Sequence, residues 1–330
     1  MMFNNKTILI TGGTGSFGQA FCEYLRSNFK PKKVIIFSRD EMKQWDMAKK
    51  FNEDFFRYFI GDVRDKERLQ MAFEGVDYVV HAAATKIVPT AEYDPFECVK
   101  TNVHGAMNVI SAALNSSSVK SVVALSTDKA SSPINLYGAT KLTSDKLFVA
   151  ANNYAGEKQK VFSVVRYGNV MCSRGSVIPF FLSLDKSKPA PITDANMTRF
   201  MISLEEGIDL VVTAFKESIG GEIYVKKIPS MKVTDIASAI LGHDKFDIIG
   251  VRLGEKIHEQ MISVEDSLTT YSYDGFYKIL PSINNWHIDK NRIKNGIKVK
   301  KDFIYSSDCN EDWMTKSQLI DYLKKEGHIK

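Results

Sequence analysis

The stretch Thr7-Ile8-Leu9-Ile10-Thr11-Gly12-Gly13-Thr14-Gly15-Ser16-Phe17-Gly18 decides the fold of this chain. Its first four residues are an apolar run that predicts a buried strand, and a helix is expected from about residue 19 to residue 28. Glycines between a strand and a helix allow a tight turn and let the backbone approach a pyrophosphate at the helix N-terminus. The stretch therefore predicts a dinucleotide-binding turn rather than a plain turn, with the candidate binding residues Gly12, Gly15, Ser16, Phe17 and Gly18.

The second predicted strand, residues 34–37, ends in Ser38, Arg39 and Asp40, and Lys43 follows within one turn. At this position an acidic residue holds the ribose of NAD, whereas an arginine accommodates the 2′-phosphate of NADP. The serine and the two basic residues favour NADP over NAD. The alternative is that Asp40 only begins a solvated helix.

The third predicted strand is followed by Asp62 and Val63, which we expect to hold an adenine edge. Asp62 could instead cap the helix predicted over residues 66–73, because aspartate is a preferred N-cap residue. Asp65 stands closer to that helix and is the better candidate for its cap.

A fourth apolar run leads into the small residues Ala82 and Ala83, which leave room for a cofactor to pass close by. His81 directly before them is predicted to be a packed core histidine rather than a catalytic one. Asn102 starts another helix, and it either bonds a loop backbone or the cofactor, or simply packs.

Strands and helices alternate up to about residue 175, which is typical of a doubly wound parallel α/β sheet. We expect residues 1–175 to form a Rossmann domain that binds NADP and carries the catalytic residues. Five prolines interrupt the chain after this point. Residues 176–285 are therefore expected to form mainly a smaller α/β substrate-binding lobe, with segments that return to the Rossmann domain. Residues 286–330 are a tail that ends in a helix.

The segment Ser126-Thr127-Asp128-Lys129 follows a predicted buried strand, and Tyr137 and Lys141 come shortly after it. Ligands of open α/β sheets bind at the carboxyl ends of strands. Helix positions i and i+4 share a face, so the Lys141 ammonium is expected to lower the pKa of Tyr137 from its usual value near 10. Such a phenolate can take the proton of a sugar alcohol while hydride leaves the same carbon. Asp128 and Lys129 add an acid and an amine; an ordinary loop ion pair is the alternative.

Composition excludes several classes of function. The chain has 330 residues and a net charge of +5, which is too mild to indicate nucleic acid binding. The four cysteines are scattered without metal-ligand spacing, so we expect no metal site, no disulfides and a cytoplasmic location. No apolar run approaches the roughly 20 residues that a membrane span needs.

Taken together, the motifs resemble extended short-chain dehydrogenases/reductases that act on nucleotide sugars. More closely, the chain is similar to the inverting UDP-N-acetylglucosamine 4,6-dehydratases of pseudaminic acid biosynthesis. The resemblance extends to about residue 285, and the segments that carry it are 11–18, 37–40, 88–97, 126–141, 166–170, 173–179, 191–194, 197–200 and 254–259.

The resemblance implies a sequence of roles. Tyr137 and Lys141, with Thr127, would run oxidation at C4 of the sugar, and NADP would accept the hydride. Lys129 would then remove the C5 proton, and Asp128 would protonate the departing C6 hydroxyl. Hydride would return to C6, and reprotonation of C5 on the opposite face would give UDP-2-acetamido-2,6-dideoxy-β-L-arabino-hex-4-ulose for surface glycan synthesis.

The resemblance also implies ligand contacts. It places the sugar nucleotide among Lys86, Asn169, Val177, Thr193, Arg199, Arg252 and Glu255, and it sets Lys86 and Val170 beside the cofactor as well. Arg199 could equally form a salt bridge that closes the lobe. We also expect a homo-oligomer, because the helices near residues 95–115 and 137–152 commonly pair in this fold.

Two other functions stay open. A UDP-hexosamine epimerase would oxidise and re-reduce the sugar without losing water, and a non-catalytic NADP-sensing protein could share the fold. Retaining 4,6-dehydratases carry Asp-Glu where this chain has Asp128-Lys129, and simple epimerases lack the pair. Cys172 and Thr85 depart from the family, which usually has glycine and a larger apolar residue at these positions.

Overall fold

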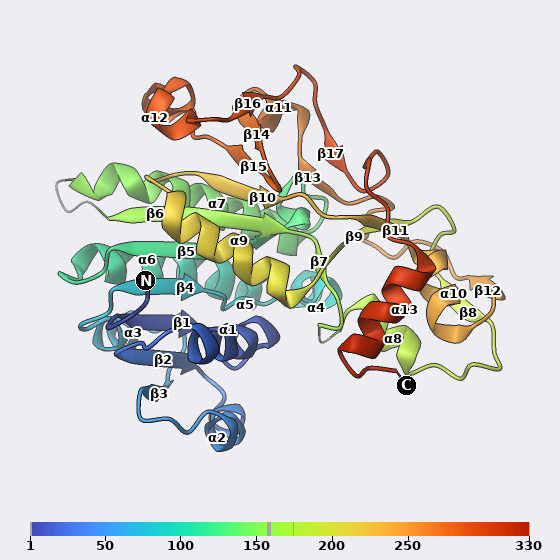
Figure 1. Ribbon diagram of the computed structural model, residues 1–330, viewed down its shortest axis with the longest axis horizontal. Helices are drawn as coiled ribbons and strands as arrows, with labels where there is room; N and C mark the ends of the chain where they lie inside the picture. Colours follow the sequence, from blue (N-terminus) through green and yellow to red (C-terminus); the bar gives the residue numbers. More distant parts are fainter. Residues whose placement is uncertain (1, 157–159, 174, 330) are drawn as a thin grey trace.

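A ten-stranded sheet forms the centre of the protein (Figure 1). The computed structural model describes residues 2–156, 160–173 and 175–329. The strands lie in the order β16-β14-β15-β10-β6-β5-β4-β1-β2-β3. Their bounds are β1 (Thr7–Thr11), β2 (Lys33–Ser38), β3 (Phe56–Ile60), β4 (Tyr78–His81), β5 (Ser121–Thr127), β6 (Val161–Tyr167), β10 (Ile223–Lys226), β14 (Thr270–Tyr273), β15 (Phe276–Ile279) and β16 (Ile297–Lys298).

Seven neighbouring strands of this sheet run parallel to one another, namely β3, β2, β1, β4, β5, β6 and β10. The strands β15, β14 and β16 follow on the β10 side, and each pairs antiparallel with its neighbour. The order β3-β2-β1-β4-β5-β6 is that of a doubly wound dinucleotide-binding sheet. The predicted fold class is therefore confirmed. β16 comes from the tail, so the C-terminal residues extend the edge of the sheet.

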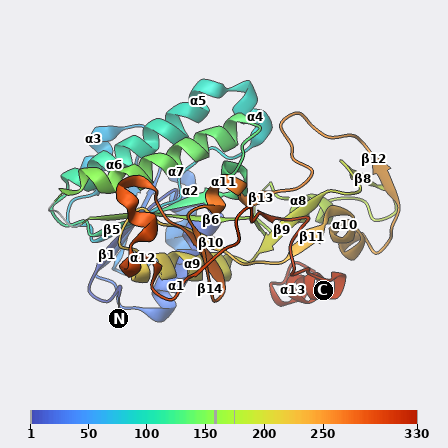
Figure 2. The same cartoon turned by 90° about the horizontal axis from the view of Figure 1, so that it is seen from above.

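Helices cover both faces of the sheet (Figures 1 and 2). α1 and α9 lie on one face, whereas α3, α6 and α7 lie on the other, with α4 and α5 beside them. The helical segments of this part are α1 (Ser16–Asn28), α2 (Glu41–Lys50), α3 (Lys66–Ala72), α4 (Val88–Tyr93), α5 (Pro95–Val99), the π-helical η1 (Lys100–His104), α6 (Gly105–Asn115), the 3-10 turn η2 (Asp128–Ala130), α7 (Leu136–Tyr154) and α9 (Leu204–Glu217).

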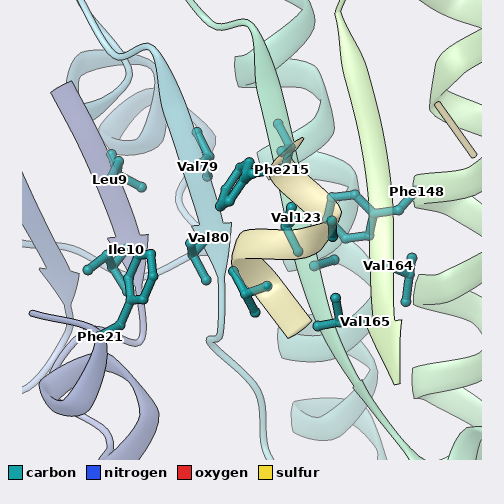
Figure 3. Close-up of a cluster of buried hydrophobic side chains, with 14 of the residues drawn as sticks. Leu9, Ile10, Phe21, Val79, Val80, Val123, Phe148, Val164, Val165 and Phe215 are labelled. Carbon is teal, nitrogen blue, oxygen red and sulfur yellow. The ribbon is translucent and has the colours of Figure 1, made fainter. Parts of the chain in front are cut away.

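The main core lies between the sheet and these two helical layers. Figure 3 shows Phe215 of α9 and Phe148 of α7 together with strand residues such as Ile10, Val80 and Val123. All five side chains are buried. Burying a side chain of this size contributes about 1.5–3 kcal/mol each, so this packing fixes the sheet that carries the site.

A smaller lobe has its own apolar cluster, built from residues of α8, α10, α13, β8 and β9. Leu319 and Leu323 of α13 are fully buried in it, and α13 packs against α10. The remaining elements are β7 (Asn169–Val170), α8 (Val177–Leu182), β8 (Ala190–Ile192), β9 (Thr198–Ile202), β11 (Ser230–Lys232), α10 (Val233–Leu241), β12 (Phe246–Ile248), β13 (Gln260–Ile262), α11 (Val264–Ser267), η4 (Ile283–Ile288), α12 (Lys290–Ile293), β17 (Tyr305–Ser306) and α13 (Lys316–Lys325).

Local polar groups begin the helices that matter for the site. The carboxylate of Asp65 accepts a hydrogen bond from Arg68 N and caps α3, as predicted. The amide oxygen of Asn135 accepts from Gly138 N and caps α7. α1 begins at Ser16, earlier than the predicted residue 19, because its N-cap is Gly15 itself. Among the described residues no helix is both long and apolar enough to span a membrane.

Candidate active site

Two adjoining cavities lie at the carboxyl ends of the parallel strands. The first has a volume of about 770 Å³ and is lined by the glycine turn and by the ends of β2, β4 and β5. The second, of about 540 Å³, opens between this edge and the smaller lobe. Lys129, Asn169 and Arg252 line both cavities. The two spaces therefore meet at the predicted catalytic pair, which suits two ligands that react with each other.

The glycine turn is shaped to receive a phosphate-bearing ligand. Gly12 has φ 66°, and a Cβ there would come within 2.8–2.9 Å of the backbone of Ala82 and Ala83. A Cβ at Gly18 would overlap the backbone of Gly13. α1 carries no acidic residue in its first turn, and its N-cap Gly15 supplies no side-chain hydrogen bond. Its first N–H groups are thus left to an anion, so a dinucleotide pyrophosphate fits this turn.

Arg39 and Lys43, the basic residues predicted to favour the 2′-phosphate of NADP, line the first cavity together with Asp62 and Val63. Arg39 is largely exposed, and its Nη1 lies 3.9 Å from Asp62 Oδ2. Asp40 caps α2 by accepting from Lys43 N, and it pairs with Lys43 Nζ at 2.7 Å. These bonds lower the pKa of Asp40. Asp40 thus performs the helix-start role that was kept as an alternative.

His81 is a packed core histidine, as predicted. Its Nδ1 lies 2.8 Å from Thr11 Oγ1, and burial lowers its pKa to about 3, so the ring is neutral. Ala82 and Ala83 line the cavity beside it.

Asn102 does not line the first cavity, which corrects its place among the cofactor contacts. The side chain is buried, donates to Thr85 O and Thr140 Oγ1, and accepts from Thr85 N. The predicted bond to a loop backbone is therefore confirmed. Asn102 shapes the cavity wall through Thr85, whose hydroxyl also donates to Asn102 Oδ1 at 3.3 Å, a bond that a larger apolar residue could not make.

Thr127, Tyr137 and Lys141 meet at the floor of the first cavity. Lys141 Nζ donates to Leu125 O at 2.7 Å, and burial lowers the pKa of Lys141. The expected lowering of the pKa of Tyr137 is wrong. Burial raises the pKa of Tyr137 to about 12, although Lys129 and the Thr127 hydroxyl act in the opposite direction. A phenolate here needs further positive charge, which a bound oxidised nicotinamide carries.

Asp128, which is buried, and Lys129, which is partly buried, form an ion pair with a third member that the motifs did not reveal. Lys129 Nζ lies 3.1 Å from Asp128 Oδ1 and 2.8 Å from Glu259 Oε1. Burial raises the pKa of Asp128, which favours a protonated carboxyl. Burial would lower the pKa of Lys129, but the two carboxylates outweigh it and raise the pKa. Glu259 ends the segment 254–259, the signal that could have found it.

The residues assigned to the sugar nucleotide line one cavity or the other. Arg199 Nη2 lies 3.3 Å from Glu255 Oε1, so this arginine forms the salt bridge kept as an alternative. Lys86 lines the first cavity, and burial lowers its pKa. The other predicted contacts in the cavity walls are Asn169, Val170, Val177, Thr193 and Arg252.

Gly175 and Ser176, between β7 and α8, line both cavities. Cys172 has φ 59°, the left-handed conformation that glycine adopts most easily, which explains why glycine is usual here. Arg174 of the segment 173–179 lies outside the described residues. No group of three or more potential metal ligands is assembled among the residues that the structure describes.

Gly138 allows the catalytic turn to pack against α7. A Cβ at this position would overlap Lys129 O and lie 3.0 Å from Pro133 Cβ. We expect Gly138→Ala to displace Lys129 and to lower turnover at least tenfold, while the better helix propensity of alanine keeps the fold stable. The measurement is turnover together with the thermal unfolding midpoint. Gly207→Ala in α9 is the control, because its nearest contact is an ordinary 3.9 Å, and equal losses in both variants would contradict the expectation.

Comparison with known proteins shows the family. A family model described as "Polysaccharide biosynthesis protein" matches residues 8–281. The chain belongs to this family. It is 56% identical over 329 residues, 98% of each chain, to a protein named UDP-N-acetylglucosamine 4,6-dehydratase (inverting) from Campylobacter jejuni. This similarity confirms the resemblance read from the motifs.

Two further relatives frame the comparison. The chain is 44% identical over 286 residues, 84% of each chain, to a protein named UDP-glucose 4-epimerase from Rickettsia akari. The structure of the present chain superposes on the X-ray structure of Pen from Bacillus thuringiensis with a TM-score of 0.90. The two chains are 35% identical, and the match covers 100% of each.

Proposed function

We propose that this protein is an inverting UDP-N-acetylglucosamine 4,6-dehydratase, a hydro-lyase that removes water across C5 and C6 of the sugar. The observation that carries the proposal is the Asp128–Lys129 ion pair, which lies beside Tyr137 where the two cavities meet. Elimination needs an acid and a base at neighbouring carbons, and this pair offers both. The 56% identity to the Campylobacter jejuni enzyme supports the same reaction.

We propose NADP as the resident cofactor of the first cavity. It would be held by the glycine turn at its pyrophosphate, by Asp62 and Val63 at its adenine, and by Ser38, Arg39 and Lys43 at its 2′-phosphate. When bound, the nicotinamide supplies the hydride acceptor at C4 and the hydride donor at C6. The exposed Arg39 side chain is the feature that favours NADP over NAD.

Tyr137 is the proposed base for the C4 hydroxyl. Thr127 lies beside the phenol, and Lys141 is anchored on Leu125 O, where its charge faces the floor of the cavity. The tyrosine takes the hydroxyl proton as the C4 ketone forms. A ketone at C4 acidifies the hydrogen at C5, which prepares the second step.

Lys129 and Asp128 are the proposed elimination pair. Lys129 first has to be neutral, and Asp128, whose Oδ1 lies 3.1 Å from the Lys129 Nζ, is the proposed acceptor of its proton. The amine then takes the C5 proton, and the protonated Asp128 gives its proton to the C6 oxygen, which leaves as water. Return of the C5 proton from Lys129 to the opposite face gives the inverted product.

The second cavity is the proposed site of the UDP moiety. Arg252 would hold the pyrophosphate and Glu255 the uridine ribose, with Arg199 as a further phosphate contact. Lys86 and Asn169 would face the sugar at the junction, and Val177 and Thr193 would line its pocket.

The NADP preference makes a direct prediction for Arg39→Ala. Loss of one charge-assisted hydrogen bond of about 1.5–3 kcal/mol weakens NADPH binding roughly 10- to 100-fold. NADH has no 2′-phosphate, so its affinity should not change. The measurement is the Kd of both cofactors for protein stripped of bound nucleotide. Equal weakening of both would contradict a role at the 2′-phosphate.

Incubation with UDP-N-acetylglucosamine in D₂O, followed by mass spectrometry and proton NMR, tests the whole proposal. Loss of water, deuterium at C5 and an arabino-configured 4-keto product are the expected results without added cofactor. Unchanged mass with inverted C4 would instead indicate UDP-hexosamine 4-epimerisation, which the 44% identity to the Rickettsia akari epimerase makes the second candidate.

A non-catalytic NADP-sensing protein is a weaker alternative. Thr127, Tyr137 and Lys141 are all present and line one cavity, and a sensor has no need of such a set. Failure to turn over any UDP-sugar with NADP supplied would nevertheless favour this alternative.

We further propose a cytoplasmic homo-oligomer. The cysteines among the described residues are all free, which suits a reducing compartment. On the side of α4 to α7, Tyr93 is 88% and Phe96 79% exposed, and Met107 is also exposed. Large apolar side chains gathered on one side are typical of a protein interface. The molar mass measured by light scattering during size-exclusion chromatography tests the proposed oligomer, and the mass of a monomer would contradict it.

A further inference from the structure

Glu259 is a buried carboxylate with no part in the reaction steps described above. Its Oε1 lies 2.8 Å from Lys129 Nζ, closer than Asp128 Oδ1 at 3.1 Å. The residue is 1% exposed, and its Oε2 has no hydrogen-bond partner among the described residues. The Lys129 ammonium therefore lies between two buried carboxylates, of which the proposed elimination uses one.

Cations around Glu259 keep it ionised. Arg199 Nε lies 3.9 Å from the same Oε1, and Lys256 adds a third positive charge nearby. Burial alone would raise the pKa of Glu259, but Lys129 and Arg199 outweigh it and the pKa is lowered. Asp128, whose ion pair is with Lys129, has its pKa raised by burial. Of the two carboxylates, Glu259 is thus the one whose negative charge its surroundings favour, and Asp128 is the one whose protonated form they favour.

The C-terminal tail holds Glu259 in place. Glu259 N donates to Ser307 Oγ at 2.9 Å, and Ser307 N donates to Glu259 O at 2.8 Å. The Ser307 hydroxyl also lies 2.7 Å from Thr198 Oγ1, and β17 pairs with β13 next to it. The tail, whose role could not be read from the sequence, therefore fixes the backbone from which Glu259 reaches Lys129.

We propose, on the basis of the dehydratase function above, that Glu259 is the fixed counter-ion of Lys129, a positioning residue that sets the pH range in which Asp128 and Lys129 exchange protons with the sugar. When the amine takes the C5 proton, an N–H bond forms and the C5–H electron pair stays on the sugar. That pair becomes the C5–C6 double bond as the C6 oxygen leaves with the Asp128 proton as water. Asp128 is neutral once it has taken the proton of Lys129, so Glu259, 2.8 Å from Lys129 Nζ, is the carboxylate that faces the new ammonium.

The charged and titratable groups that face Lys129 come from several elements, namely Asp128 on η2, Tyr137 on α7, Arg199 on β9, and Lys256 and Glu259 ahead of β13. Removing one negative charge from this set lowers the pKa of each neighbour, because an ammonium loses a favourable partner and a carboxylate or phenolate loses a repulsive one. Both limbs of the pH–rate profile then move to lower pH. A side chain with only a structural role would change the height of the profile and leave its position.

Glu259→Gln in the full-length protein tests the proposal. We expect the pH–rate profile of water loss to move to lower pH by about 1–3 units relative to wild type, as expected for an opposite charge at this distance. A profile that only shrinks would overturn the counter-ion role and leave the dehydratase function intact. Wild-type protein that loses no water from UDP-N-acetylglucosamine would instead overturn the function on which the inference rests.

Glu255→Gln is the matched control. It removes a carboxylate that pairs with Arg199 rather than Lys129, so KM should rise while the profile stays in place. Glu259→Asp keeps the charge but is one methylene shorter, and it should give a smaller shift in the same direction. If Glu259→Gln does not fold, the aspartate variant decides, and its unmoved profile would overturn the proposal.

Discussion

Tyr137→Phe is expected to lower kcat/KM about 10²- to 10⁴-fold, the usual contribution of a positioned general base. The substitution removes the phenolic oxygen and keeps the ring, which is buried against Ala91 and Cys98. Packing is therefore preserved, and the thermal unfolding midpoint and the affinity for UDP-N-acetylglucosamine should change little. Turnover by mass spectrometry and binding by calorimetry measure the two effects separately.

The pH dependence gives this prediction a second measurement. Burial raises the pKa of the Tyr137 phenol to about 12, so the phenol is protonated at neutral pH before a cofactor binds. A cationic nicotinamide nearby favours the phenolate, and the titration should move to lower pH once cofactor is bound. Tyr154→Phe, on the exposed end of α7, is the control with unchanged activity. Near-normal turnover by Tyr137→Phe would assign the base elsewhere.

Those parts of the site that depend on neighbours in sequence could be predicted. The strand-to-helix turn at residues 7–18 and the pair Tyr137 and Lys141 on one helix follow from short-range geometry. The Asp128–Lys129 step follows the end of β5, and the carboxyl end of a parallel strand already indicates a ligand site. The residues that these local rules single out all line the first cavity, namely Thr127, Asp128, Lys129, Tyr137 and Lys141.

The parts that depend on tertiary packing could not be predicted. Glu259 reaches Lys129 because β13 pairs with β17, a contact between distant segments that no local pattern encodes. From the sequence, the pKa of Tyr137 is expected to fall because of the Lys141 ammonium. This expectation does not account for burial, which raises the pKa and can only be seen in the folded chain. Asn102 was assigned to the cofactor because the loop around Thr85, which takes up its hydrogen bonds, was invisible in sequence.

Tertiary contacts also join the loop at the second cavity to the catalytic turn at the first cavity. The loop from Gly254 to Lys256 is tied to the catalytic turn, because Asn135 Nδ2 donates to Gly254 O and Lys256 Nζ donates to Ser131 O, each at 2.7 Å. The loop proposed to bind the UDP moiety is therefore hydrogen-bonded to the segment that follows the acid–base pair. Binding of the nucleotide half of the substrate can thus order the groups that act on its sugar.

Asp128→Asn is expected to stop the reaction after the first step. Thr127 Oγ1 and Lys129 Nζ both donate to Asp128 Oδ1, and an asparagine oxygen in that place accepts both bonds, so the turn should keep its shape. Asparagine has no acidic proton for the C6 oxygen, and loss of a general acid slows water elimination about 10²- to 10⁴-fold. Oxidation at C4 depends on Tyr137 and should persist.

The measurement for Asp128→Asn is a single turnover followed by absorbance of the reduced nicotinamide and by mass spectrometry of the sugar. Reduced cofactor should accumulate together with a 4-keto sugar that has kept its C6 oxygen. In wild-type protein the same intermediate should pass on to product, because burial raises the pKa of Asp128 and keeps its proton available. Normal water loss in the variant would show that the leaving hydroxyl receives its proton from another group, and the assignment of Asp128 as the acid would be wrong.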